Sequence, residues 1–135
     1  MTPRKITLTF SARGYELDSY GHVNNAVYLN YFEHARWEFF RELGLLTLLE
    51  KLDVIAVVTE IRIRYQREVK IFDELTIDSQ CRPEGPYLIF QQRLINGSTG
   101  LQAARAVTRL IFIDRDRVPQ DIPPEVLDMI NKRNV

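Results

Sequence analysis

The 135-residue sequence lacks the features that mark several classes of protein. It contains a single cysteine, Cys81, so no disulfide can form within the chain, and a free thiol is typical of a reducing cytosol. It has no run of about 18 apolar residues, which a membrane-spanning helix needs. Its first ten residues lack the apolar stretch of a signal peptide. Basic and acidic residues number 18 each, so no excess charge attracts nucleic acid or an anionic membrane. We therefore expect a cytoplasmic protein with no nucleic-acid or membrane partner.

Motifs of several enzyme classes are missing too. The sequence has no glycine-rich phosphate loop, no Gly-x-Ser-x-Gly elbow and no Cys-x-x-Cys pair. Its two histidines, His22 and His34, have no third ligand at a metal-binding spacing, so we expect no metal and no cofactor. Cys81 lies in a predicted strand, away from any histidine or helix start, and is interpreted as a small core residue.

What the sequence does contain is the length of one domain and two clear hydrophobic periodicities. Asn24 or Asn25 caps a predicted helix, and Gly44 supplies a left-handed stop after it. Apolar residues at helical spacing form one face: Tyr28, Phe32, Ala35, Phe39 and Leu43. Alternation predicts strands within residues 5–13, 54–66, 74–82, 87–95 and 101–114. A short helix is expected at about 123–133, with proline at its start.

This order of elements predicts the α+β class over a single domain, 1–135. One antiparallel, five-stranded sheet would wrap around one long helix. Such a sheet has two edge strands with unpaired backbone groups, and pairing between copies would cover them. We therefore expect at least a homodimer.

The polar loop before the long helix admits two interpretations. A carboxylate such as Asp18 is stabilised near a helix N-terminus by the backbone N–H groups and the helix dipole, with no catalytic role. Alternatively, the free N–H groups of residues 25–27 hold an oxyanion, while Asp18 activates water or attacks a carbonyl. Spacing alone favours the structural interpretation. His22 could donate to a carbonyl or orient Asp18.

Other charged residues have simpler explanations. Glu33 and Arg36, three apart on the helix, predict an ion pair, and His34 is interpreted as a surface residue. Alternation places Arg62 with Arg64, and Arg105 with Arg109, on common sheet faces. Most such charges solvate a surface, but a subset could hold the phosphates of coenzyme A.

The string from Asp18 to Arg36 resembles the motif of hotdog-fold acyl-CoA thioesterases of the 4-hydroxybenzoyl-CoA thioesterase-like family. The matching residues are Asp18-Ser19-Tyr20-Gly21-His22-Val23-Asn24-Asn25, Tyr28 and Glu33-His34-Ala35-Arg36. The tetrapeptide His22-Val23-Asn24-Asn25 (HVNN) is most similar to the long-chain acyl-CoA and acyl-ACP thioesterase branches of this family. The segment 65–77 also resembles the family's second-strand turn, and the resemblance extends from about residue 6 to 113.

The resemblance implies a hotdog fold and hydrolysis of a medium- or long-chain fatty acyl-CoA, or of an aryl-CoA, by a homodimer or homotetramer with active sites between subunits. Asp18 falls on the catalytic carboxylate, and the backbone N–H of Asn25 falls where the thioester carbonyl is polarised. Val27, Tyr28 and Thr59 are candidates for lining the acyl site, as is Tyr31. His22 is a further catalytic candidate. Plant acyl-ACP thioesterases have an asparagine at the position of Tyr20, so their Asp-Asn-His set is not carried over whole.

Two alternatives stay open. A hotdog dehydratase of 3-hydroxyacyl thioesters needs a histidine paired with a carboxylate, and the proline-rich motifs around that histidine are absent here. A non-catalytic acyl-CoA or acyl-ACP binding module would keep the fold and the pocket without hydrolysing the thioester.

Overall fold

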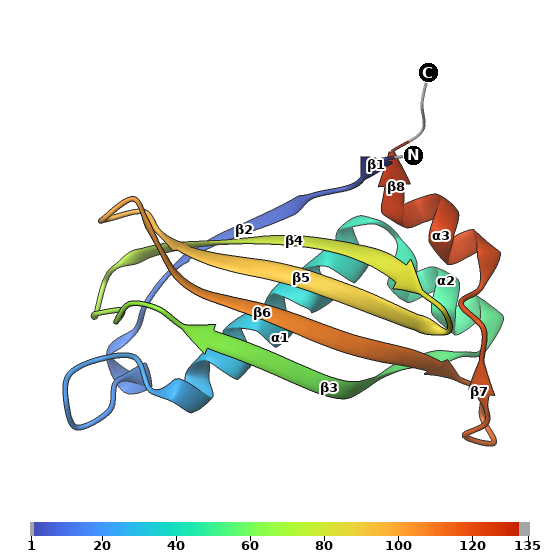
Figure 1. Cartoon of the computed structure of the whole chain (residues 1–135), viewed down its shortest axis with the longest axis horizontal. Helices are drawn as coiled ribbons and strands as arrows, with labels where there is room; N and C mark the ends of the chain where they lie inside the picture. Colours follow the sequence, from blue (N-terminus) through green and yellow to red (C-terminus); the bar gives the residue numbers. More distant parts are fainter. Residues whose placement is uncertain (1, 133–135) are drawn as a thin grey trace.

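The structure, a computed structural model, describes residues 2–132 and consists of one long helix held against an antiparallel sheet (Figure 1). The main strands are β2 (Ile6–Ser11), β3 (Ile55–Tyr65), β4 (Glu74–Glu84), β5 (Tyr87–Asn96) and β6 (Leu101–Ile113), paired in the order β2-β4-β5-β6-β3. A two-residue strand, β7 (Pro119–Gln120), extends the sheet beside β6. The predicted α+β architecture and all five predicted strands are confirmed.

The long helix α1 (Asn25–Glu42) begins and ends where the sequence indicates. The Asn24 side chain caps it by accepting the N–H of Ala26 at 2.9 Å. Gly44 ends it with a φ of +74°, a left-handed conformation that glycine adopts without strain. A second helix that was not predicted, α2 (Leu45–Leu52), follows at once and buries Leu45 and Leu49.

The ends of the chain form a small separate ladder. The predicted C-terminal helix is present as α3 (Pro124–Ile130), and residue 133 of the predicted range lies outside the described residues. Asn131 leaves the helical conformation, with φ −113° and ψ 147°, because β8 (Asn131–Lys132) pairs with β1 (Thr2–Pro3).

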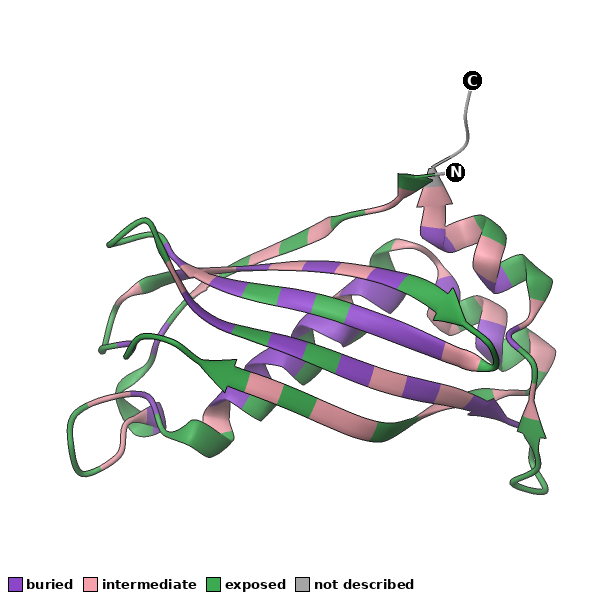
Figure 2. Ribbon diagram, viewed as in Figure 1, coloured by how far each residue is buried: buried purple, intermediate pink, exposed green. Residues whose placement is uncertain are grey.

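Two apolar clusters fill the space between the sheet and the helices. Buried residues recur along α1 and alternate with more exposed ones along much of the strands, as Figure 2 shows. The N-terminal half of α1 packs Tyr28, Tyr31 and Phe32 on β2, β4, β5 and β6, while its C-terminal half packs Phe39 and Phe40 with α2 and α3. Cys81 is buried in the second cluster, and burial raises the pKa of its thiol, so the predicted core role is confirmed.

The predicted ion pair between Glu33 and Arg36 is wrong. Arg36 lies on the inward stripe, 4% exposed, and its Nη1 donates to Gln92 Oε1 at 3.3 Å and Thr108 Oγ1 at 3.4 Å. Glu33 is exposed and forms no ion pair with Arg36 in the described part of the chain. Residues three apart are neighbours on a helix, but the Arg36 side chain extends into the core, where Gln92 and Thr108 accept its hydrogen bonds. His34 is exposed, as predicted, and lies 3.7 Å from Glu38.

The strand β3 contains a bulge that the alternating pattern did not predict. The pairing with β6 skips one residue between Val58 and Glu60, which leaves Thr59 exposed with its hydroxyl donating to the Arg109 carbonyl at 3.3 Å. Beyond the bulge, Ile61, Ile63 and Tyr65 alternate with outward residues as expected. Within residues 2–132, no helix is both long and apolar enough to cross a membrane.

Candidate active site

The loop that carries Asp18 is closed on itself just before α1. Its two sides meet at a bridge between Leu17 and Val23, and the N–H of Asn24 donates to the Glu16 carbonyl at 2.9 Å. Within the loop, the N–H of Asp18 donates to the His22 carbonyl at 2.8 Å. The chain therefore presents Asp18 on a short, hydrogen-bonded excursion at the helix N-terminus.

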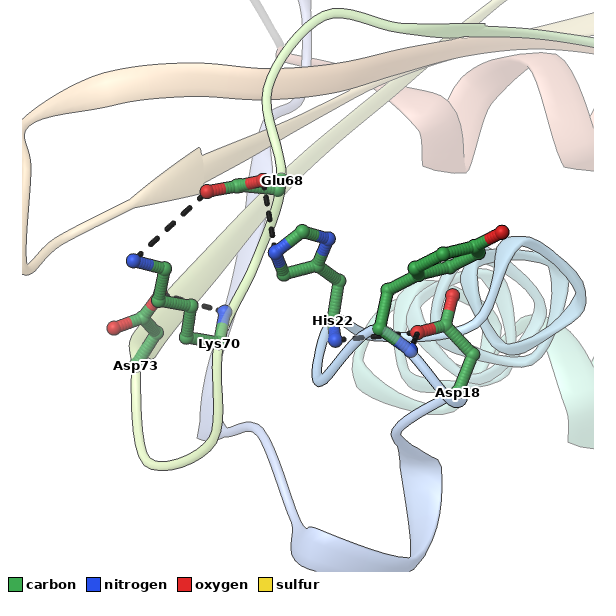
Figure 3. Close-up of polar contacts among 6 residues, drawn as sticks. Asp18, His22, Glu68, Lys70 and Asp73 are labelled. Carbon is green, nitrogen blue, oxygen red and sulfur yellow. Dashed lines mark hydrogen bonds and ion pairs between the residues drawn. The ribbon is translucent and has the colours of Figure 1, made fainter.

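One oxygen of the Asp18 carboxylate is bonded to its own loop. Oδ1 accepts the backbone N–H of Tyr20 at 2.9 Å and that of His22 at 3.3 Å. Figure 3 shows the contact between Asp18 and His22. Oδ2 has no hydrogen-bond partner in the described part of the chain. Because the residue is only half-buried, this oxygen is available to a water molecule or a ligand.

The helix N-terminus offers a single free donor rather than the three expected. The Asn24 side chain occupies the N–H of Ala26, and the Asn24 carbonyl accepts the N–H of Val27 at 2.9 Å. Of these three N–H groups, only that of Asn25 has no partner in the described part of the chain. Capping therefore uses two of the donors, and the remaining one belongs to the residue that the resemblance indicates.

The His22 side chain points away from the Asp18 carboxylate (Figure 3). Its Nε2 lies 2.9 Å from Glu68 Oε2, and Glu68 is in turn 3.9 Å from Lys70 Nζ. His22 thus contributes to the Asp18 carboxylate through its backbone N–H, while its side chain connects the loop to the turn between β3 and β4. The sequence did not single out Glu68, because its contact with His22 spans two elements.

A second carboxylate, on the inner side of the loop, was also missed. Glu16 is 7% exposed, and its Oε1 accepts the Tyr31 hydroxyl and the Arg13 N–H, each at 2.7 Å. Burial, followed by the bond to Glu16, raises the pKa of Tyr31. The spacing of Arg13 and Glu16 was visible in the sequence, but the contact from α1 was not. This cluster ties the start of the Asp18 loop to the first turns of the helix.

Two buried tyrosines of α1, Tyr28 and Tyr31, lie beside the Asp18 loop. Tyr28 is 3% exposed and packs edge-on against Tyr65, with ring centroids 5.0 Å apart, and the Tyr65 hydroxyl donates to the Asn25 carbonyl at 3.0 Å. Burial raises the pKa of Tyr28 to about 12, with smaller contributions from the charges of Tyr65, Asp18 and Glu68. Tyr28 and Tyr31 are thus core residues beside the loop.

A cavity with a volume of about 680 Å³ lies at the other end of α1 and is open to solvent on one side. It is bordered by the C-terminal half of α1, α2 and the start of β3. Its apolar walls include Trp37, Phe40, Leu46, Leu49 and Ile55. Asp18, Val27, Tyr28 and Thr59 do not line it.

The outer face of the sheet carries a row of arginines. Arg64 pairs with Arg105 across β3 and β6, Arg105 with Arg93 across β6 and β5, and Arg93 with Asp78 across β5 and β4. Only Arg93 of these three forms an ion pair in the part of the chain described, to Asp78 at 3.0 Å. The proposal that a subset holds coenzyme A phosphates stays a prediction. No group of three potential metal ligands occurs within residues 2–132.

Comparison with known proteins places this geometry in a family. The sequence profile of the thioesterase-like superfamily matches residues 13–130. The long-chain acyl-CoA thioesterase FadM of Escherichia coli is 36% identical over 103 residues, 76% of this chain and 78% of that protein. The acyl-CoA thioesterase YbgC of Haemophilus influenzae is 32% identical over 124 residues, 87% of this chain and 90% of that protein. Among solved structures, the probable thioesterase YbaW of Escherichia coli superposes with a TM-score of 0.85 at 30% identity, covering 93% of this chain and 98% of that one.

Proposed function

Because the chain belongs to the thioesterase-like superfamily, it is a thioester hydrolase, and we propose that it cleaves medium- or long-chain fatty acyl-CoA to the free acid and coenzyme A in the cytoplasm. The observation that carries the assignment of the site is that one carboxylate oxygen of Asp18 and the backbone N–H of Asn25, at the start of the same helix, both lack a hydrogen-bond partner among the described residues. The identity with FadM, whose name specifies long-chain acyl-CoA, supports the choice of acyl group.

The proposed chemistry assigns one role to each group. The Asn25 N–H donates to the thioester oxygen and stabilises the negative charge that develops there, assisted by the helix dipole. Asp18 Oδ2 takes a proton from water as the water oxygen attacks the carbonyl carbon. The C–S bond then breaks, and the proton passes from Asp18 to the coenzyme A thiolate. Direct attack by Asp18, through an anhydride that water opens, is the alternative use of the same oxygen.

A homodimer would bring the cavity to this site. The Tyr65 end of β3 is next to Asn25, and the Ile55 end of β3 borders the cavity. In a two-fold antiparallel pairing of β3 with its copy, the Ile55 end of one strand lies opposite the Tyr65 end of the other. The cavity of one subunit would then lie beside the Asp18 loop of its partner and take the acyl chain. Pairs of such dimers would form the homotetramer.

The test is thiol release from acyl-CoAs of short to long chain and from an aryl-CoA, with wild type and Asp18→Asn in parallel. We expect Asp18→Asn to lower kcat on the order of 10² to 10⁴-fold, the range for a general base. The asparagine Oδ1 still accepts the N–H groups of Tyr20 and His22, so the loop should keep its shape.

The matched control is Asp121→Asn, an exposed aspartate outside the site, which should leave turnover unchanged. Near-normal hydrolysis by Asp18→Asn would remove Asp18 from the mechanism. Folded wild-type protein that leaves every acyl-CoA intact overnight would instead favour a binding module or an acyl carrier protein substrate.

A further inference from the structure

The cavity at the C-terminal half of α1 contains a cation that the proposed hydrolysis does not use. Arg36 lines this cavity and is 4% exposed. Only its Nη1 has hydrogen-bond partners among the described residues, Gln92 and Thr108, at 3.3 and 3.4 Å. Every fully shielded side-chain nitrogen or oxygen in this part of the chain has a partner. Nε and Nη2 of Arg36 are therefore not fully shielded, and the cavity is the space that Arg36 lines.

No carboxylate neutralises this guanidinium within ion-pair distance in the region that the structure describes. Burial lowers the pKa of Arg36, and the negative charge of Glu33 raises it by a smaller amount. A guanidinium presents five N–H donors and no acceptor, so the free ones need an oxygen. An acyl chain without oxygen would cover these donors with methylene groups and leave them unpaired, which is unfavourable.

The charges around the cavity indicate which kind of oxygen suits it. Its charged lining residues are four acids and three arginines: Glu33, Glu50, Asp53, Asp114, Arg36, Arg115 and Arg117. A carboxylate on the ligand would therefore enter a lining that already carries one excess negative charge. A hydroxyl or keto oxygen can accept from Arg36 without that repulsion.

We propose that the preferred acyl group carries a neutral oxygen, hydroxyl or keto, that accepts a hydrogen bond from Nε or Nη2 of Arg36 inside this cavity. The proposal rests on the proposed function and narrows its substrate class. In the proposed dimer the thioester is held outside this cavity, at the Asp18 loop of the partner subunit, and only the acyl chain enters it, so the oxygen belongs to the part of the acyl chain remote from the thioester. Arg36 then determines specificity, because a buried donor that is left unpaired discriminates against an acyl group lacking the oxygen.

The experiment compares kcat/KM for palmitoyl-CoA and for hydroxypalmitoyl-CoA isomers with the hydroxyl at the middle, penultimate or terminal carbon. We expect wild type to prefer at least one isomer over palmitoyl-CoA by about tenfold. Arg36→Met, which keeps an unbranched apolar side chain but has no donor, should reduce this ratio to about one. Arg41→Met is the matched control, because Arg41 is an exposed arginine of α1 outside the cavity, and it should keep the preference.

The wild-type ratios test the proposal even if Arg36→Met does not fold. Equal turnover of palmitoyl-CoA and all isomers by wild type would overturn it and leave the thioesterase assignment intact. A preference that survives in folded Arg36→Met would also overturn it. Release of thiol from none of the substrates would refute the proposed function itself, and the inference with it.

Discussion

At the scale of single residues, the site depends on groups that hold Asp18 rather than on Asp18 alone. The buried carboxylate of Glu16 accepts the Tyr31 hydroxyl at 2.7 Å, and its backbone carbonyl accepts the N–H of Asn24. One residue thus fixes the beginning of the Asp18 loop to the helix and to the N-cap. A catalytic group that is displaced by about 1 Å can lose 10²-fold in rate, so this anchoring is functionally important.

Tyr31→Phe removes only the hydroxyl of this anchor. We expect the free energy of unfolding to fall by roughly 1 to 3 kcal/mol, because the buried carboxylate of Glu16 loses the hydrogen bond from the Tyr31 hydroxyl. We also expect kcat to fall by about tenfold with little change in KM, since Tyr31 would position Asp18 without contacting substrate. Urea denaturation and steady-state kinetics measure the two effects.

The control for this variant is Tyr15→Phe, because Tyr15 is 82% exposed and should tolerate loss of its hydroxyl. A Tyr31→Phe protein that is less stable but has unchanged kcat would show that the anchor serves the fold alone.

At the scale of elements, β3 is the strand that carries an open edge next to the site. It pairs with β6 on one side, and its other side has no partner strand within residues 2–132. Its exposed apolar residues Ile55, Val58 and Tyr65 make this edge suited to pairing with a second copy. The bulge at Thr59 lies near its middle, where a two-fold axis would bring two copies of the same residue together.

Thr59→Lys tests this interface. Two lysines facing each other across the axis would repel, so we expect the dimer to dissociate to monomers at micromolar concentration. Sedimentation velocity measures the mass. Thr9→Lys, on the opposite edge strand β2, is the control and should leave the dimer intact. The reverse result would move the interface to β2, and dimers in both variants would exclude both edges.

At the scale of the whole molecule, buried tyrosines couple stability to alkaline pH. The pKa of Tyr28 is about 12 in the folded protein against 10.0 for the ordinary group. Below pH 10 both states keep the proton and there is no effect. Between about 10 and 12 the unfolded state releases it first, so stability falls as pH rises.

We expect Tyr28 alone to contribute a loss of roughly 2 to 3 kcal/mol by the top of this window. Urea midpoints at about pH 9, 10 and 11 measure the slope, and Tyr28→Phe should flatten it. The slope should not vanish, because the pKa of Tyr31 is raised as well. Tyr15→Phe should keep the full slope; a flat wild-type profile would contradict the pKa shift of Tyr28.

Local patterns in the sequence predicted the five main strands and α1, and the family resemblance singled out Asp18. Period-two alternation, the Asn24 cap and the Gly44 stop are properties of neighbouring residues, so the strands and α1 could be predicted from them. The string from Asp18 to Asn25 likewise lies in one segment, and its resemblance to thioesterases was confirmed at the level of the family.

Contacts between distant segments were decided only by the tertiary structure. Arg36 turned inward because Gln92 and Thr108, on two other strands, accept its hydrogen bonds, whereas local spacing predicted a pair with Glu33. His22 meets Glu68, and Glu16 meets Tyr31, across separate elements. The cavity exists because α2 and β3 border the end of α1. Periodicity describes which face a residue shares with its neighbours, but only packing decides which remote groups that face will meet.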